Sequence, residues 1–342
     1  MRVGLYGHTH GIGYRDDSNQ FLKSIPATLM RPVEIAQQAE RAGFHSIWFP
    51  DHVCMPISST SAHVANESRA RGYEPRHEIL DGAVVMGAIA TATTRLKLAT
   101  SVLIAPYRHP LNDARQLATV DVLSGGRLLA GVGAGWLEEE FAALGLSFTE
   151  RGRMTDECIE IYKRAWADEV VSFSGCHYRF ENLSMDPKPV QRPRPPIIYG
   201  GVSKAGAKRA ARLCDGLFPL FLDPGSDPSR ATALQDVVRR ELDAQGRDPG
   251  DFLMLAGVSM RITDVSDPVV RRKPRPICTG TAEQVLEDLA RFGAAGYSLV
   301  VALFDCPSHS VDELVEQIER AGRDVLPAAT GIAPKGCWKT VD

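Results

Sequence analysis

Short apolar runs alternate with longer amphipathic stretches along the whole chain. Eight runs have the length and composition of buried strands: Arg2–Tyr6, Ser46–Phe49, Leu96–Leu103, Leu128–Val132, Pro196–Tyr199, Gly216–Leu222, Phe252–Ile262 and Tyr297–Phe304. The stretches between them predict helices: Pro32–Ala42, Asp81–Thr91, Pro110–Leu123, Arg151–Ala167, Ser203–Leu213, Pro228–Gln245, Thr281–Phe292 and Val311–Val325. Each predicted strand is therefore followed by a helix.

This alternation predicts an α/β fold of one domain, a (β/α)8 TIM barrel over residues 1–342. Strands separated by helices pair in parallel through right-handed crossovers, and eight such units close into a ring because an open sheet would leave two edges. We expect an insertion after the strand-4 helix, at about 168–195, with a hairpin at Val171–Phe180. A C-terminal tail is expected at about 328–342.

Two connections are longer than the barrel needs, Pro50–Ile79 and Asp264–Gly280. Loops of this length inside a compact domain are typical of lids, binding loops or disordered segments. We expect the first to cover the substrate. The second carries the run Arg271–Pro276 and is expected to be mobile.

Composition narrows the classes of partner and compartment. The formal charge is only −3, and no apolar run is long enough for a membrane span. The 7 cysteines are scattered and contain no Cys-x-x-Cys pair, which argues against a disulfide framework or a cysteine-ligated zinc. We expect a cytoplasmic protein with no nucleic-acid or membrane partner and no signal peptide.

The pair Asp51–His52 directly follows the second predicted strand. In a parallel barrel, residues just past the strand C-termini line the active site. A carboxylate beside an imidazole can fix its tautomer and tune a proton donor. The alternative is a loop aspartate that caps a turn, next to a surface histidine.

A second candidate is the segment Gly200–Ser203, which joins the fifth strand to a helix. Backbone N–H groups at a helix start, with glycines that permit close approach, suit a phosphate. Lys204 and Lys208 would add positive charge nearby. The alternative is a tight strand-to-helix turn with Ser203 as the N-cap residue.

The glycines Gly131, Gly133 and Gly135 stand at the end of the fourth strand and just beyond it, and they are not a dinucleotide fingerprint. The acid at about the right offset, Asp156, lies inside a predicted helix. We expect these glycines to let the backbone pass close to a flat ring at the barrel mouth. Trp136 would be a stacking wall for the substrate or simple packing.

His8 and His10 follow the first strand as a His-x-His pair, which could ligate a metal together with Asp305. A metal-dependent hydrolase on a barrel also needs histidines after strands five and six, and none lies between His177 and His309. We keep this class as a distant alternative and otherwise assign His10 to the substrate region. His109 is a further substrate candidate, for which a helix-entry turn is an equal explanation.

Five stretches together resemble the luciferase-like monooxygenase superfamily, which uses flavin or the deazaflavin coenzyme F420. They are Ala39–His52, Leu98–Leu103, Gln116–Trp136, Arg151–Glu157 and Ile197–Gly201. The resemblance implies a (β/α)8 barrel with the isoalloxazine or deazaflavin ring in its mouth and the phosphate near Gly200–Gly201. It also implies a non-proline cis peptide at Ser101–Val102, against which the ring leans.

The resemblance implies a set of site residues. The cofactor would lie against Asp51, Thr100, Ser101, Val102, Gly133, Gly200, Gly201, Val202 and Ser203. His52 would transfer the proton, and Asp51 would orient His52 or contact the ring. Trp136 stands where sugar-phosphate dehydrogenase relatives have a proton-donating glutamate, so a glucose-6-phosphate-type activity is not expected.

The leading hypothesis is F420-dependent hydride transfer to or from a small organic substrate. The alternative is a monooxygenase that receives reduced FMN from a separate reductase. A non-catalytic flavin-binding protein of the same fold is a third possibility. We expect a homodimer or higher oligomer, formed through the helices Asp81–Thr91 and Pro110–Leu123.

Overall fold

The computed structural model of the protein describes residues 1–15, 20–61, 76–221, 228 and 232–341. Its centre is a closed ring of parallel strands, as predicted, and the pairing of β7 with β10 completes the ring. In ring order the strands are β1 (Arg2–Tyr6), β4 (Ser46–Phe49), β5 (Lys97–Thr100), β7 (Leu128–Gly133), β10 (Ile197–Gly200), β11 (Gly216–Phe218), β13 (Leu253–Ile262) and β15 (Leu299–Phe304). The α/β TIM-barrel fold is therefore confirmed.

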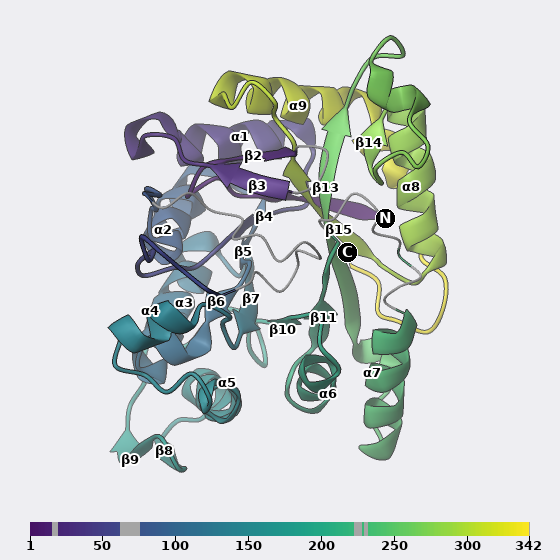
Figure 1. Ribbon diagram of the computed structural model, residues 1–342. Helices are drawn as coiled ribbons and strands as arrows, with labels where there is room; N and C mark the ends of the chain where they lie inside the picture. Colours follow the sequence, from purple (N-terminus) through teal and green to yellow (C-terminus); the bar gives the residue numbers. More distant parts are fainter. Residues whose placement is uncertain (16–19, 62–75, 222–227, 229–231, 342) are drawn as a thin grey trace.

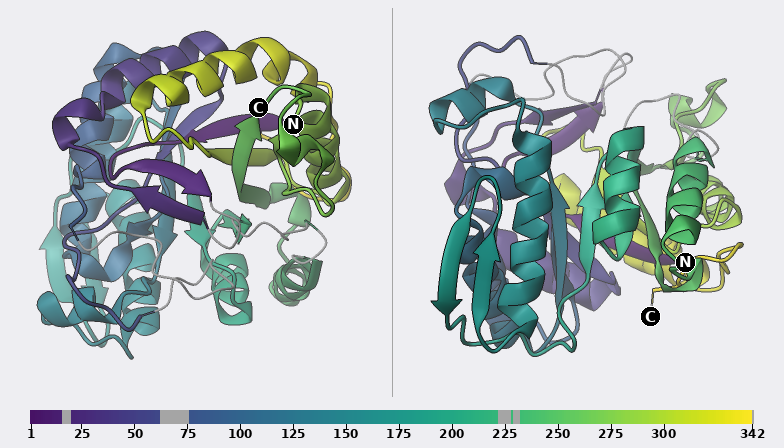
Figure 2. Two further views of the ribbon diagram at one scale, coloured as in Figure 1. Left: turned by 45° about the horizontal axis from the view of Figure 1, so that its top comes forward. Right: turned by 90° about the horizontal axis from the view of Figure 1, so that it is seen from below.

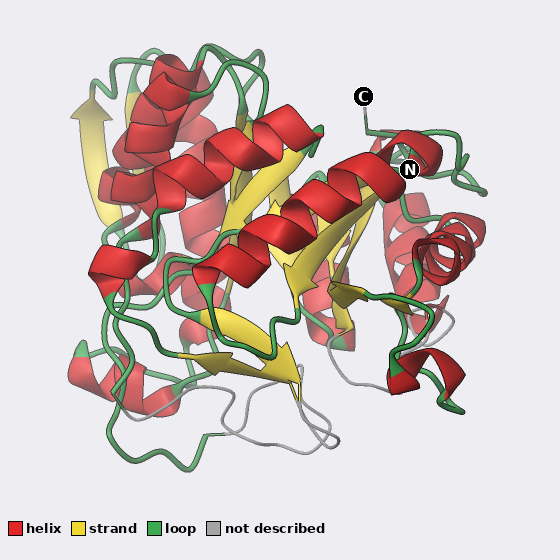
Figure 3. Ribbon diagram, turned by 90° about the horizontal axis from the view of Figure 1, so that it is seen from above, coloured by secondary structure: helices red, strands yellow, loops and turns green. Residues whose placement is uncertain are grey.

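Helices surround the ring on its outer side (Figures 1 and 3). They are α1 (Pro32–Ala42), α2 (Gly82–Ala92), α3 (Pro110–Ser124), α4 (Glu138–Ala143), α5 (Arg151–Ala167), α6 (Lys204–Leu213), α7 (Thr232–Ala244), α8 (Ala282–Ala294), α9 (Val311–Asp324) and α10 (Leu326–Ala329). Cap chemistry sets several starts. Asp81 accepts a hydrogen bond from the Val84 N–H, and Thr281 and Gln284 form a capping box at α8.

Alternation along each strand separates the barrel interior from the layer under the helices. In β1, Val3 and Leu5 belong to the large cluster under the helices, whereas Tyr6 packs against the interior cluster. Trp48 fills the interior beside Phe218, with ring centroids 5.0 Å apart. Successive side chains of a strand point to opposite faces. Every second residue of β1 therefore points into the barrel, and Tyr6 is the one nearest the C-terminal mouth.

The predicted third strand, Leu96–Leu103, is not continuous. The structure has β5, then β6 (Leu103–Ile104), and the peptide bond between Ser101 and Val102 is cis. The sixth predicted strand is likewise two pieces, β11 and β12 (Leu220–Phe221), and Leu222 lies outside the described residues. A pattern of apolar residues does not reveal such breaks, because both pieces stay buried.

Two antiparallel hairpins decorate the barrel. The hairpin predicted at Val171–Phe180 is present as β8 (Val171–Ser174) and β9 (Arg179–Leu183), and it lies beside α5 (Figure 2). A second hairpin, β2 (Ile12–Arg15) and β3 (Gln20–Lys23), follows β1 and was not predicted. The short helix α4 was also missed, because six residues carry too little periodicity.

The segment Asp264–Gly280 differs from the expectation of a mobile loop. It contains the 3-10 helix Pro268–Arg271 and the short strand β14 (Thr279–Gly280), which pairs with β13. Ion pairs fasten it: Arg275 lies 2.8 Å from Asp288, and Arg261 lies 2.9 Å from Asp267.

The first long connection is described only in part. Residues 62–75 lie outside the described residues, so the expected cover over the substrate stays a prediction. Its later part is anchored, because the Leu80 N–H donates to the Thr9 carbonyl at 2.8 Å. In the described ranges, no helix combines the length and apolar character that a membrane crossing requires.

Candidate functional site

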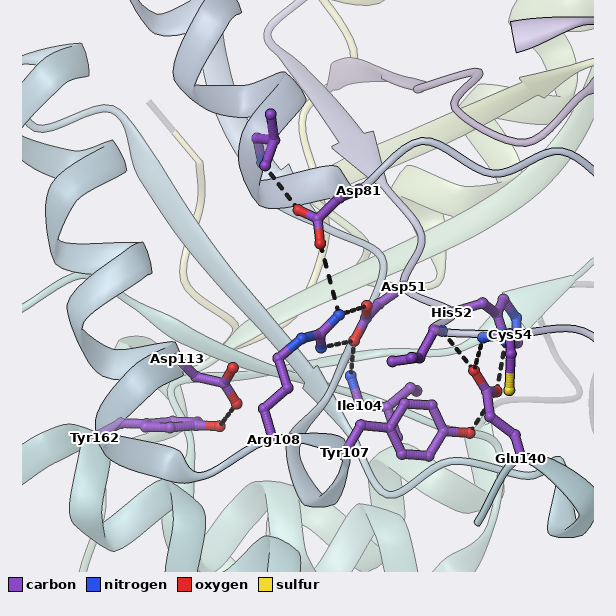
Figure 4. A network of polar contacts seen from close by, with 12 residues as sticks. Asp51, His52, Cys54, Asp81, Ile104, Tyr107, Arg108, Asp113, Glu140 and Tyr162 are labelled. Carbon is purple, nitrogen blue, oxygen red and sulfur yellow. Dashed lines mark hydrogen bonds and ion pairs between the residues drawn. The ribbon is translucent and has the colours of Figure 1, made fainter. Parts of the chain in front are cut away.

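A fully buried carboxylate, Glu140, organises the barrel mouth. It comes from α4, directly beyond the end of β7. One oxygen, Oε2, lies 2.9 Å from His52 Nδ1 and accepts a hydrogen bond from the Tyr107 hydroxyl at 2.7 Å. The other, Oε1, accepts from the backbone N–H groups of Val53 at 2.6 Å and Cys54 at 3.1 Å (Figure 4). Glu140 therefore holds the segment after β4 in place.

The hydrogen bonds decide the charge of Glu140. Burial alone would raise its pKa, but the donors from His52, Tyr107 and Cys54 outweigh burial, and the pKa lies below its usual value. Burial and the neighbouring Glu140 charge raise the pKa of Tyr107 well above normal, so the phenol keeps its proton. Glu140 is thus an ionised acceptor at neutral pH.

This charge fixes the tautomer of His52. An ionised carboxylate can only accept, so His52 Nδ1 must carry the proton that it shares with Glu140. The opposite ring nitrogen, Nε2, then points away from Glu140. Both side chains are withdrawn from solvent, with 5% of His52 and 0% of Glu140 exposed.

Asp51 has a different partner from the one expected. Its carboxylate forms a two-pronged pair with Arg108, with distances of 2.7 and 2.8 Å, and Oδ2 also accepts from the Ile104 N–H at 2.9 Å. Of the two roles expected for Asp51, orienting His52 is therefore wrong, and contact with the cofactor ring stays a prediction. Asp51 faces Arg108, whereas the neighbouring His52 faces Glu140 (Figure 4).

A third acid lies behind this ion pair. Asp113 of α3 is fully buried, and its Oδ2 accepts from the Tyr162 hydroxyl at 2.9 Å. Burial raises the pKa of Asp113 to about 7, although the Tyr162 hydroxyl and the Arg108 charge act to lower it. Arg108 also lies 3.9 Å from Asp81, so one guanidinium serves several carboxylates.

Val102 is held between two glycines at the ends of neighbouring strands. A Cβ atom on Gly133 would lie 2.5 Å from Val102 Cγ2, and one on Gly200 would lie 2.6 Å from Val102 Cγ1. The glycines therefore make room for this side chain first, rather than only for a flat ring. Thr100 supports the same region, since its hydroxyl donates to the Gly131 carbonyl at 2.6 Å.

The turn before α6 has the helix-capping role considered above. Ser203 Oγ accepts from the Gly206 N–H at 3.0 Å, and the Gly201 N–H donates to the Phe218 carbonyl at 3.3 Å. Val202 lies between them and is partly exposed. The first turn of α6 contains no acidic residue, and its leading N–H groups have no acceptor within the helix. These features suit a phosphate, which stays a prediction.

Aromatic and imidazole rings gather around His52. The Trp136 ring meets it edge-on at a centroid distance of 6.3 Å, and the His10 ring lies 6.4 Å away. Tyr6 of β1 extends this group, 6.0 Å from His10. The structure thus brings His10, Trp136 and His52 together.

His109 is not part of this group. It is exposed, its Nδ1 accepts from the Leu111 N–H at 3.3 Å at the start of α3, and its ring contacts Tyr178. The helix-entry explanation therefore accounts for it.

The His-x-His segment does not form a metal centre within the described residues, where no group of three or more His, Cys, Asp or Glu side chains is arranged to hold an ion. His8 Nδ1 is engaged with the Gly11 carbonyl at 2.9 Å.

Sequence reasoning missed Glu140 and Tyr107. A signal for Glu140 was available, because the acidic run Glu138–Glu140 comes just after a strand end, where barrel active sites form. Tyr107 had none, since its partner is 33 positions away in sequence.

Comparisons with known proteins place this geometry in context. A profile of the family described as "Luciferase-like monooxygenase" matches residues 5–298. The "FMNH(2)-dependent dimethylsulfone monooxygenase" of Pseudomonas putida is 33% identical over 216 residues, which cover 62% of this chain and 53% of that enzyme. The chain therefore spans about half the length of that relative.

Two solved structures share the fold. One is an F420-dependent secondary alcohol dehydrogenase in complex with an F420–acetone adduct, with a TM-score of 0.71 and 20% identity over 96% of this chain and 98% of that one. The other is the FMN-bound oxygenating constituent of 3,6-diketocamphane monooxygenase from Pseudomonas putida, with a TM-score of 0.73 and 16% identity over 98% and 100%.

Proposed function

The chain belongs to the luciferase-like monooxygenase family, whose members are flavin- or F420-dependent oxidoreductases, and from that premise we propose F420-dependent hydride transfer as its reaction. The substrate would be a small organic molecule that gains or loses a hydride together with a proton. The observation that carries this proposal is the buried His52–Glu140 pair at the mouth, with its 2.9 Å contact.

His52 has the features of a proton acceptor and donor. Glu140 fixes the proton on Nδ1, which leaves Nε2 as the nitrogen that exchanges a proton with substrate. When Nε2 gains a proton, the ring becomes cationic, and the ionised Glu140 stabilises that charge at short range in a buried setting. An alcohol that loses a hydride must also release its hydroxyl proton, and His52 would receive it.

The chain's own residues fit a flat ring with a phosphate. Gly133 and Gly200 carry no side chains beside the Ser101–Val102 step, so Val102 is the side chain that a ring placed there would meet. The N–H groups at the start of α6 and the side chain of Lys204 would meet the phosphate. When bound, F420 would supply the hydride-accepting ring carbon, and reduced FMN would supply reactivity toward oxygen.

The rival function is an FMNH2-dependent monooxygenase served by a separate reductase. One observation favours it: the relative at 33% identity is named as FMNH2-dependent. The buried His52–Glu140 pair favours hydride transfer. That reaction requires a proton acceptor, and the ionised Glu140 stabilises the positive charge that His52 gains with the proton.

The experiment has two parts. The purified protein is titrated with F420, FMN and FAD, oxidised and reduced, by fluorescence and thermal shift. A cofactor at about 100 times its Kd adds ~2.7 kcal/mol of stability, which is readily detected. Binding of F420 but not FMN supports the proposal, and tight binding of FMN alone supports the rival.

The second part tests His52. We expect His52→Ala to lower turnover by ~10²–10⁴ with little change in cofactor Kd, because only proton transfer is lost. The matched control is His109→Ala, an exposed histidine outside the mouth, which should turn over normally. Near-normal turnover of a correctly folded His52→Ala protein contradicts the proposed role.

A further inference from the structure

His8 is a buried histidine beyond the end of β1, and only 2% of it is exposed. Its Nδ1 lies 2.9 Å from the Gly11 carbonyl oxygen. Its Nε2 is buried and has no hydrogen-bond partner in the part of the chain that the structure describes. Buried polar atoms without a partner are rare, and each calls for an explanation.

The single hydrogen bond determines what the free nitrogen can do. A carbonyl oxygen only accepts, so Nδ1 carries the proton and Nε2 carries a lone pair. Burial lowers the pKa of His8 to about 4, against the raising effect of the Gly11 hydrogen bond, so the ring is neutral at physiological pH. Nε2 is therefore a pure acceptor.

His8 belongs to the barrel mouth. Tyr6 packs against the interior cluster, and His8 is two positions further along the same run. Ring contacts continue from there: Tyr6 lies 6.3 Å from His8 and 6.0 Å from His10, and His10 lies 6.4 Å from His52. A row of rings thus connects His8 to the proposed proton acceptor.

We propose that His8 Nε2 accepts a hydrogen bond from an N–H or O–H group of the molecule bound in the mouth. This inference rests on the proposed function, because it requires a ligand beside His52. The donor is either the ring imide N–H of the cofactor or a hydroxyl of the substrate. A carboxylate or another anionic acceptor would face a lone pair and be rejected.

The physical reason is the cost of an unsatisfied acceptor. A buried polar atom without a partner costs ~1–3 kcal/mol, and a ligand that donates to it recovers that cost on binding. A site of this kind discriminates strongly against analogues that lack the donor, because they leave the acceptor unpaired.

The test follows the ¹⁵N NMR signal of His8 Nε2. The protein is labelled with ¹⁵N-imidazole histidine, and His8 Nε2 is assigned by its loss in H8Q. We expect the unprotonated-nitrogen signal in the free protein and an upfield shift when a donor binds. FMN and N3-methyl-FMN form one matched pair of probes. Propan-2-ol and its methyl ether form the second, added to protein saturated with F420.

A shift with FMN but not with N3-methyl-FMN identifies the cofactor N–H as the donor. A shift only with propan-2-ol identifies a substrate hydroxyl. In parallel, H8L should weaken the identified ligand ~5–150-fold, the equivalent of the cost above, whereas H8Q retains an acceptor and should weaken it less. Thermal unfolding of both variants checks that the fold survives.

The outcomes separate the two proposals. If the cofactor that binds, F420 or FMN, leaves the His8 signal unmoved and propan-2-ol does so too, this inference is overturned while the proposed function stands. A protonated Nε2 in the free protein also overturns it. If no cofactor binds, the proposed function fails and this inference falls with it.

Discussion

Two carboxylates near the end of β4, Asp51 and Glu140, are balanced in different ways. Asp51 faces a guanidinium that is permanently charged, through contacts of 2.7 and 2.8 Å. Glu140 faces a phenol, two backbone N–H groups and an imidazole, none of which carries a permanent charge. The first arrangement is an ion pair. In the second, His52 can gain or lose a proton while Glu140 remains its partner.

This difference assigns separate roles to neighbouring residues. The Asp51–Arg108 pair connects the loop after β4 to the turn before α3, and the hydrogen bonds to Asp51 raise the pKa of the Arg108 guanidinium further, so Arg108 keeps its charge. The Glu140–His52 pair can hold a neutral or a cationic imidazole with the same geometry. Both acids lie just beyond a strand end, so this position does not distinguish them. The side chain with which each acid pairs determines its role.

The largest effect expected from these two acids follows from removing the Glu140 charge. Glu140→Gln should lower kcat by ~10²–10³, because the imidazolium that forms at His52 loses its counter-charge. Tyr107→Phe is the matched control, since it removes one donor and keeps the carboxylate, and its loss should be smaller. The decisive readout is kcat of the two variants measured side by side, which should fall much further in Glu140→Gln than in Tyr107→Phe. An equal loss in both variants would reduce Glu140 to a loop anchor.

A smaller effect, on stability rather than turnover, is expected from Arg108→Gln. The change leaves Asp51 without its cation in a site where 9% of that side chain is exposed. Unpairing a buried ion pair costs ~3–5 kcal/mol, and partial exposure of Arg108 reduces this to about 1–3 kcal/mol. Urea unfolding measures the loss. The double variant Asp51→Asn/Arg108→Gln should recover much of it, and a double variant as unstable as the sum of both singles would argue against the pairing.

The smallest effect concerns Glu139, beside Glu140 in α4. It accepts from the Ser61 hydroxyl at 2.7 Å and the Thr60 N–H at 2.8 Å. Burial would raise its pKa, but these hydrogen bonds outweigh burial and lower the pKa of Glu139 from 4.5 to about 2. A lowered folded-state pKa stabilises the fold above the unfolded value, and this contribution is lost as pH falls from about 4.5 through 2.

Thermal unfolding of Glu139→Gln tests this directly. Its midpoint should lie slightly below that of the unmodified chain at pH 7, and the difference should shrink toward zero as pH approaches 2. Glu138→Gln, a solvent-exposed neighbour, is the control. A difference that is constant across pH would show that the Glu139 charge plays no part.

The sequence predicted the barrel, and it placed the candidate site at the C-terminal ends of the strands, which stays a prediction. Periodicity located the strands, and the strand-end rule selected Asp51–His52, Gly133 and Gly200–Ser203. It also predicted the β8–β9 hairpin and included the capping role of Ser203 as one of two alternatives for that turn. These features depend on neighbours in the chain, so local patterns carry them.

Pairing at the site could not be predicted in the same way. His52 and Glu140 are 88 positions apart, and Asp51 and Arg108 are 57 apart. Which acid serves which base depends on how β4, β7 and the turn before α3 converge in the closed ring. The unpaired acceptor Nε2 of His8 could not be predicted from the sequence either, because it follows from the burial of the ring and from the hydrogen bond between Nδ1 and the Gly11 carbonyl.

The sequence by itself determined the order of strands and helices, because hydrophobic period and cap residues act within a few positions. It also determined which residue types stand at the strand ends. Only the tertiary structure decided that Glu140 is the partner of His52 and that Arg108 neutralises Asp51. Ring closure brings these distant side chains within hydrogen-bonding distance, and burial then sets the charge that each of them carries.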